Sequence, residues 1–328
     1  MSNKDIYLKL FSQEPEKFPV LFSPWWLDAV CGEENWDVLL YSKGDKIYGL
    51  WPYFRTKQNI FNKILQPGFT QYNGPLLFYP EGLTEVKRLE FEKKVISNLI
   101  DILPKEVDMI SINSNPLLLN WLPFYWRGFR QTTRYTYATN SLSGKDEEAL
   151  LQTYTKDVRK SIKKFQSQGF VYKDAKDVNF SSRDFFLLHK ECLMKINRKI
   201  SYTEELLKRM VDYSVSNKSG KLIVVQDENN HICGATFFIY NSFEAVGINT
   251  AADHTIRDLG YFLNHLCILE ASKLVGSYNI GGSMIEGVEK TYRQFGLHQT
   301  PYFNISKEIS KRYKIYSAVR NFGKAILR

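Results

Sequence analysis

The chain has 328 residues, of which 44% are hydrophobic and 15% aromatic, and it carries a formal net charge of +9. This length allows two cores of ordinary size, and no stretch approaches the roughly 20 consecutive apolar residues of a membrane-spanning helix. The excess of Lys and Arg favours an anionic partner, such as a nucleotide phosphate, RNA, an acidic glycan or a lipid surface. A diffuse basic surface is the alternative.

Residues that would mark a compartment or a metal site are sparse. The first 18 residues are charged throughout and lack the apolar core of a secretory signal. The four cysteines form no CxxC pair and have no histidine at metal-ligand spacing. We therefore expect a cytoplasmic protein with reduced, mostly buried thiols and no metal. The cysteines are Cys31, Cys192, Cys233 and Cys267.

In chain order, the first part of the sequence predicts a helix, a hairpin, a helix, a strand and a helix. The hairpin turns around Lys43-Gly44-Asp45, and a Gly/Pro loop follows it. These elements span 23–31, 38–54, 81–102, 107–114 and 116–128, with the loop at 67–75.

The second part predicts helices followed by the same series. Its hairpin turns around Asp227-Glu228-Asn229-Asn230. Hairpin, strand, helix, strand, helix and strand together indicate a mixed α/β sheet. The elements are helices over 146–168 and 182–216, a hairpin over 223–239, a strand over 243–250, a helix over 261–275, a strand over 277–282 and a helix over 286–295.

Two internal echoes indicate that these parts are repeats. The hairpins align without gaps at an offset of 185, which places Gly49 on Gly234. The segments 125–137 and 291–303 both run from an aromatic residue through Arg-x-Phe into a Tyr-containing strand. We therefore predict two modules, over 1–138 and 139–305.

The tail predicts a separate element over 306–328. Six apolar residues recur three or four apart, with Lys and Arg on the other side, which is typical of an amphipathic helix. We expect this helix to pack back on the body of the protein, with peripheral membrane contact as the alternative. The six are Ile309, Tyr313, Tyr316, Val319, Phe322 and Ile326.

The glycine-rich stretch 281–287 is not a nucleoside triphosphate site, because no lysine stands where a P-loop needs one. None of the five histidines belongs to a catalytic or metal-binding motif, and we expect them to be structural. A better phosphate site begins at Arg257, where a strand ends and a helix starts at Gly260 and Tyr261. Backbone N–H groups and the dipole at a helix N-terminus favour a pyrophosphate.

Two further clusters could bind a ligand. Basic residues, among them Arg159 and Lys163, lie on a helix that starts the second module, although such a run is also typical of a solvated face. The loop 66–78 brings Tyr72 next to Gly74-Pro75, and it could line a binding cleft or simply pack in the core.

The sequence resembles the GNAT-type acyltransferase superfamily, and within it the Fem-related branch, which carries two GNAT modules in one chain. In that branch the second module closes on G-G-x(4)-G-x(3)-F-K-x-x-F-G, and here Gly281-Gly282, Gly287 and Thr291–Gly296 match this pattern. Tyr292 stands where the relatives carry lysine. Lys290 or Arg293 could take the place of that lysine.

The resemblance implies an α/β fold of tandem acyl-CoA N-acyltransferase modules. It implies acyl-CoA or acetyl-CoA as donor, an amine acceptor such as a cell-envelope or polysaccharide precursor, and no DNA partner. We expect Arg257, Gly260 and Tyr261 to bind the donor, and Tyr292 is the candidate catalytic residue. The acceptor residues are expected to be Tyr72, Arg159, Lys163, Arg198, Tyr292 and Arg293.

Two other functions stay open. One is an aminoacyl-tRNA-dependent transferase of the Fem kind that builds on a cell-wall precursor, which the +9 charge favours. The long helical hairpin of some tRNA-using Fem enzymes has no counterpart here. The other is a non-catalytic module that binds an anionic glycan or lipid precursor.

Overall fold

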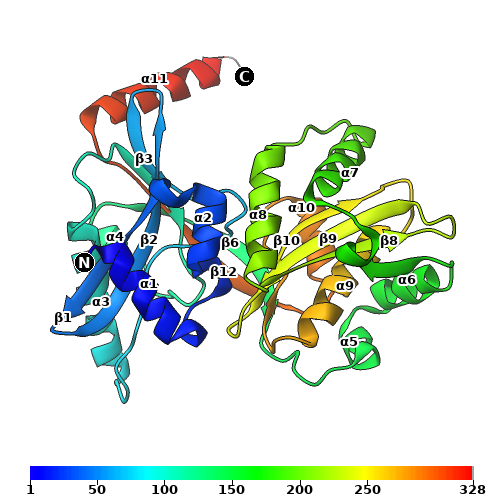
Figure 1. The fold of residues 1–328 in the computed structure, drawn as a ribbon. Coiled ribbons are helices and arrows are strands. Elements are labelled where there is room, and N and C mark those ends of the chain that lie inside the picture. The colour runs from blue at the N-terminus through cyan, green and yellow to red at the C-terminus, as the bar shows by residue number, and fades with distance from the viewer. Residues whose placement is uncertain (327–328) are drawn as a thin grey trace. The chain divides into compact units, whose positions relative to one another are not determined.

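The structure is a computed structural model that describes residues 1–326, with side chains up to Phe322, and the chain folds into two compact units (Figure 1). Unit 1 comprises 1–13, 31–134 and the chain from Pro301 onward, and unit 2 comprises 14–30 and 135–300. Neither unit is a continuous stretch. The module boundaries expected at 138/139 and 305/306 therefore describe the repeat in the sequence and stay a prediction.

Unit 1 is built on a mixed sheet whose strands follow the order β1-β2-β3-β5-β12, with β4 paired to β2. The hairpin expected over 38–54 is present, and β3 pairs in parallel with β5. Its elements are α1 (Asn3–Gln13), η3 (Glu33–Asn35), β1 (Trp36–Lys43), β2 (Lys46–Gln58), β3 (Phe61–Leu65), β4 (Leu76–Leu77), α3 (Glu85–Asp101), β5 (Met109–Asn113), α4 (Leu122–Trp126) and α11 (Lys311–Ile326).

Unit 2 has the order β6-β11-β10-β9-β8-β7. Helices α5, α6 and α9 form a core with one face of this sheet, and α7 and α8 lie on the other face (Figure 1). Its elements are η1 (Pro15–Lys17), η2 (Val20–Phe22), α2 (Pro24–Cys31), α5 (Glu147–Thr153), α6 (Lys156–Gln166), β7 (Val171–Asp174), η4 (Ala175–Val178), α7 (Ser182–Lys195), α8 (Glu204–Ser216), β8 (Gly220–Gln226), β9 (Ile232–Tyr240), β10 (Ala245–Ala252), α9 (Leu259–Ser272), β11 (Tyr278–Asn279) and α10 (Glu286–Tyr292). Two strands cross the division: β6 (Arg130–Thr139) lies in unit 2 from Tyr135 on, and β12 (His298–Glu308) lies in unit 1 from Pro301 on.

The repeated glycines mark where a helix packs closely on the second strand of each hairpin. A Cβ on Gly49 would lie 2.4 Å from Cγ1 of Val95 in α3, and a Cβ on Gly234 would lie 2.8 Å from Cδ1 of Leu263 in α9. Any larger residue would push the helix off the sheet. The echo found in the sequence is thus a packing requirement that both units share.

The last strand of each repeat pairs away from its own repeat. In unit 1, β12 pairs antiparallel with β5 over Asn304–Glu308. In unit 2, β6 pairs antiparallel with β11 at Ala138 and Thr139. This exchange of strands explains why the compact units are discontinuous in the sequence.

Three expected helices are shorter or interrupted. The helix expected over 116–128 is only α4, because Asn115 forms a turn through its side chain before Pro123 starts the helix. The stretch 146–168 breaks at Tyr154, which turns into the core with an extended backbone. The stretch 182–216 breaks after Lys195, where α7 ends, and Asn197, with a φ of +55°, turns the chain away from the helix.

Helix α11 attaches to unit 1 through one face only. Tyr313 and Tyr316 contact the ring of Phe61, at 5.0 and 4.9 Å between ring centroids. The guanidinium of Arg312 donates to both carboxylate oxygens of Asp108, at 2.7 and 2.6 Å. Ile309 precedes the helix, and Val319 and Phe322 are exposed rather than packed. The side chain of Ile326, also expected on this face, lies outside the described residues.

Candidate functional site

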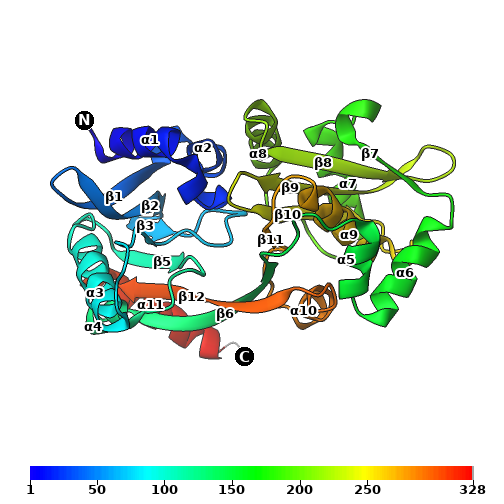
Figure 2. The same ribbon diagram turned by 90° about the horizontal axis from the view of Figure 1, so that it is seen from below.

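The candidate site of unit 2 begins where β10 and β11 separate. These parallel strands pair only at Ala245–Tyr278 and Val246–Asn279, after which β11 ends and β10 continues to Ala252. A bulge between Gly247 and Asn249 leaves Ile248 without a partner on β9. Bulges of this kind re-aim backbone groups next to binding sites. Figure 2 shows β10 and β11 as neighbours in unit 2, and we call the place where their pairing stops the gap.

Small residues are required at the mouth of this gap. A Cβ on Gly247 would lie 2.9 Å from the Tyr278 hydroxyl oxygen, and Gly281 (φ +81°) follows β11 with the carbonyl of Gly247 3.0 Å from its Cβ position. Gly281 therefore belongs to the wall of the gap, and not to a phosphate loop.

The N-terminus of α9 follows β10 after the turn 253–258, and its first N–H groups have no acceptor within the helix. Gly260 has open space around its Cβ position, and the Arg257 side chain is 85% exposed. The carboxylate of Asp258 makes no cap hydrogen bond, and Nε of Arg257 lies 3.6 Å from it. By helix geometry the first amides of α9 need an acceptor from outside the helix. This end of the helix fits an anionic group.

Phe262 does not obstruct this approach. The side chain is 2% exposed and lies in the core, with its ring 4.9 Å from that of Phe165 in α6. Tyr261 stands beside the helix start, and its hydroxyl accepts a hydrogen bond from Gln294 at 3.4 Å. The expected donor residues Arg257, Gly260 and Tyr261 are thus together, and Tyr261 links them to the end of α10.

Tyr292 ends α10 and packs against the core of unit 2. Burial raises the pKa of this phenol to about 12, with a further effect of Cys267, so the hydroxyl stays protonated at neutral pH. A negative charge on Tyr292 would also raise the pKa of Tyr278 in β11. Arg293, next in the chain, is exposed and lies 3.8 Å from the Glu289 carboxylate.

A polar cluster lies on the other face of β10. The Asn249 side-chain amide donates to the Tyr202 hydroxyl at 2.8 Å and lies 3.2 Å from Nδ1 of His189. Nδ1 of His189 is 2.6 Å from the same hydroxyl. Burial, with His254 nearby, lowers the pKa of His189 to about 4, so the imidazole is neutral and accepts the hydroxyl proton. This network fixes the Asn249 amide and directs its carbonyl oxygen away from His189.

A second polar chain is buried on the α9 side. Nδ1 of His265 is 3.2 Å from the Tyr154 hydroxyl, and Nε2 is 3.1 Å from Oε1 of Glu147. Carboxylate, imidazole and hydroxyl in this order resemble a nucleophilic triad. However, His265 is 0% and Tyr154 4% exposed, and burial raises the pKa of Tyr154. A substrate cannot reach this hydroxyl, so the chain ties α5 to α9.

The remaining expected residues do not gather in one place. Arg159 and Lys163 lie on α6, where they bond to Gln152 and Glu148 of α5. Arg198 lies in the exposed loop between α7 and α8. Tyr72 is 2% exposed and belongs to unit 1.

The counterpart of the gap in unit 1 is closed. There β3 and β5 play the parts of β10 and β11, but the loop 66–75 is bonded to the end of β5. The amide of Asn113 donates to the Gln66 side chain at 2.7 Å, its side chain donates to the Gln71 carbonyl at 2.7 Å, and its carbonyl accepts from Asn73 at 3.0 Å. The loop expected to contact a ligand through Tyr72 thus fills this position.

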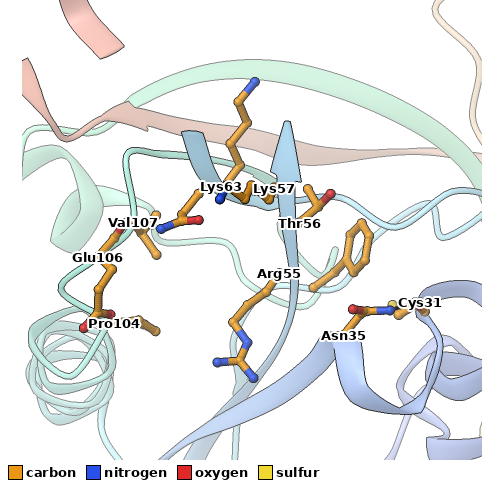
Figure 3. Close-up of a pocket in the computed structure, with 11 residues that line it drawn as sticks. Cys31, Asn35, Arg55, Thr56, Lys57, Lys63, Pro104, Glu106 and Val107 are labelled. Carbon is orange, nitrogen blue, oxygen red and sulfur yellow. Dashed lines mark hydrogen bonds between the residues drawn. The ribbon is translucent and has the colours of Figure 1, made fainter. Parts of the chain in front are cut away.

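Unit 1 also contains a polar cavity of about 470 Å³ outside the expected site. Figure 3 shows Arg55 projecting into it from β2, between the loop that carries Glu106 and the turn that carries Asn35. Within residues 1–326, no cluster of His, Cys, Asp or Glu could hold a metal ion, and no helix is both long and apolar enough to cross a bilayer. The four cysteines are buried, as expected.

No protein-family model and no curated protein matches the sequence. Solved structures do match the fold. One described as the crystal structure of FemX superposes with a TM-score of 0.66 at 11% identity, covering 92% of this chain and 96% of that one. The structure of L-PGS from Bacillus licheniformis superposes with a TM-score of 0.53 at 11% identity, covering 97% of both. The chain therefore shares the fold of these two proteins. A conserved protein of unknown function from Bacteroides thetaiotaomicron VPI-5482 also shares this fold, with a TM-score of 0.53 at 14% identity over 87% of this chain and 90% of that one.

The expected fold class is therefore confirmed, but the sequence missed the cluster of His189, Tyr202 and Asn249. The three residues lie on α7, on a loop and on β10, and 60 positions separate the outer two. The one usable signal was the position of Asn249 near the end of a strand in the second module.

Proposed function

We propose that unit 2 is an N-acyltransferase site that moves an acyl group from a thioester, acyl-CoA in the first instance, to an amine. The observation that carries this proposal is the separation of β10 and β11, because β10 has a different environment on each of its faces. On one face lies the anion-accepting N-terminus of α9, and on the other lies the neutral cluster around Asn249.

The donor fits the first environment. Phosphates of the donor would bind the free amides around Gly260, with Arg257 supplying a charge-assisted contact. The thioester would then lie in the gap, next to the bulge. The backbone N–H of Ile248, at the bulge, would donate to the carbonyl oxygen of the thioester as negative charge develops there.

The acceptor fits the second environment. In the described structure the Asn249 carbonyl oxygen has no hydrogen-bond donor, so it can accept one N–H of the incoming amine. The neutral amine attacks the thioester carbon, a C–N bond forms and the C–S bond breaks. The amine loses its surplus proton to water, and the leaving thiolate takes a proton from the Tyr292 hydroxyl, which water then restores. The products are an amide and a free thiol.

The donor half is tested by native mass spectrometry and calorimetry with a panel of acyl-CoAs. We expect binding that Arg257→Ala weakens roughly tenfold, since an exposed charge-assisted contact is lost. Arg183→Ala is the matched control, because this arginine is also exposed but lies on α7, on the other face. Equal losses in both variants would show a diffuse charge effect and refute the proposed phosphate position.

The chemical half is tested with Tyr292→Phe. We expect a fall in kcat of about 10²-fold or more with unchanged donor binding, because only the proton transfer is removed. Unchanged kcat would exclude Tyr292 as the acid.

The aminoacyl-tRNA alternative makes a different prediction for the donor. If no acyl-CoA binds but a charged tRNA does, with affinity that falls steeply with salt, the same gap would serve an ester donor. Ligand binding without any transfer would instead support the non-catalytic alternative.

A further inference from the structure

An apolar stripe on α11 faces away from unit 1. Ile315, Val319 and Phe322 are 67%, 68% and 70% exposed, and their spacing of four and three places them on one side of the helix. The opposite side carries Tyr313 and Tyr316, which contact Phe61. The helix is therefore attached by one face and presents a second apolar face to solvent.

Positive charge surrounds this stripe. The segment 311–326 contains no acidic residue, and Lys311, Lys314 and Arg320 are exposed on it. Of its cations with described side chains, Arg312 is bound to Asp108. The others form no ion pair within the described part of the chain.

A cation-lined cavity of about 590 Å³ lies beside the same helix. Arg130, Lys307 and Lys314 line it, with Glu308 as the one carboxylate. Nζ of Lys307 donates to the Arg127 carbonyl at 2.6 Å, and burial together with Lys314 and Arg127 lowers its pKa. Positive charges this close repel one another, so the cavity gains from an anion that neutralises them.

We propose that the stripe and this cavity form a docking surface for an anionic lipid bilayer. The stripe inserts at the level of the acyl chains, and a lipid phosphate occupies the cavity beside it. Charge complementarity selects this occupant over a second copy of the chain, because two such helices would bring uncompensated positive charge together. The surface lies in unit 1 and the proposed transfer site in unit 2, so each proposal can fail without the other.

The test is co-sedimentation of the full chain with vesicles of phosphatidylglycerol and phosphatidylcholine, compared with vesicles of phosphatidylcholine alone. We expect binding to the anionic vesicles that high salt weakens. Ile315→Ser/Val319→Ser/Phe322→Ser should reduce the partition coefficient at least about 30-fold through lost apolar insertion. Arg130→Gln/Lys314→Gln should reduce it about 25-fold, at about fivefold for each cation.

Matched controls come from unit 1. Val86, Leu117 and Leu119 are 67%, 57% and 67% exposed, so their joint replacement by Ser removes the same kind of surface elsewhere. Lys87→Gln/Lys105→Gln removes two exposed charges away from α11. Controls that bind like the unaltered protein support the proposal. Equal binding to both vesicles, or equal losses in the controls, would overturn it. So would concentration-dependent dimerisation, by light scattering, that the triple stripe variant abolishes while vesicle binding is absent.

Discussion

The pKa of His189 gives a sharp test of the polar cluster in unit 2. In the folded chain this pKa is about 4, against about 6.5 for an unperturbed histidine, because the ring is half-buried. The unfolded chain therefore binds a proton first as the pH falls. The stability that the neutral ring contributes is fully present above pH 6.5 and is lost as the pH falls through that value towards 4.

The size of this effect follows from the shift. A difference of roughly 2.5 pKa units corresponds to about 3 kcal/mol at 1.36 kcal/mol per unit, and partial exposure of the ring reduces the expected loss to about 2 kcal/mol. Protonation would turn Nδ1 from an acceptor into a donor that faces the Tyr202 hydroxyl and the Asn249 amide. The hydrogen bonds of the cluster would then have to rearrange.

The assay compares the protein with His189→Gln by urea unfolding between pH 7.5 and 4. At pH 7.5 the variant should be less stable by about 1 kcal/mol, since a buried hydrogen bond is lost. At pH 4 the variant should be as stable as the original protein or more stable, because the other histidines titrate in the same way in both proteins. Following the His189 ring protons by NMR measures the pKa directly. A value near 6.5, or parallel stability curves, would refute the cluster as described.

Three further outcomes follow from the contacts. Arg312→Ala should lower the free energy of unfolding of unit 1 by about 2–3 kcal/mol, because Asp108 stays buried without its partner, and adding Asp108→Asn should recover part of that loss. Gly247→Ala should cost about 1–3 kcal/mol and abolish donor binding, since its Cβ would lie 2.9 Å from the Tyr278 hydroxyl; stability and calorimetry check this. Asp258→Asn should tighten acyl-CoA binding severalfold by removing a negative charge at the α9 N-terminus, and unchanged affinity would place the phosphates elsewhere.

The repeat could be predicted from the sequence because its cause is local. Gly49 and Gly234 occur at one offset since each must admit a helix against a hairpin strand, and that requirement fixes a residue type at a fixed distance from a turn. The Arg-x-Phe echo has the same origin. Phe129 and Phe295 are both buried at the junction between a short helix and a long strand.

The exchange of the last strands could not be predicted in this way. β6 and β12 have similar patterns, and nothing in either strand specifies which neighbour it pairs with. The pairing depends on contacts between residues more than 130 positions apart. For the same reason the cluster of His189, Tyr202 and Asn249 gave no local signal.

The two units show how one architecture can support different roles. In both, a pair of parallel strands separates after two or three residue pairs, which creates the same opportunity for a ligand. In unit 1 the loop 66–75 satisfies the backbone at the end of β5 through Asn113, and a buried tyrosine seals it. In unit 2 the turn 253–258 connects β10 to α9, and its backbone N–H groups at Asp253 and Ile256 donate to Cys233 and Asp253. Backbone groups that lose their strand partner need another hydrogen-bond partner, so this difference between the two units supports the proposal that the donor binds in unit 2.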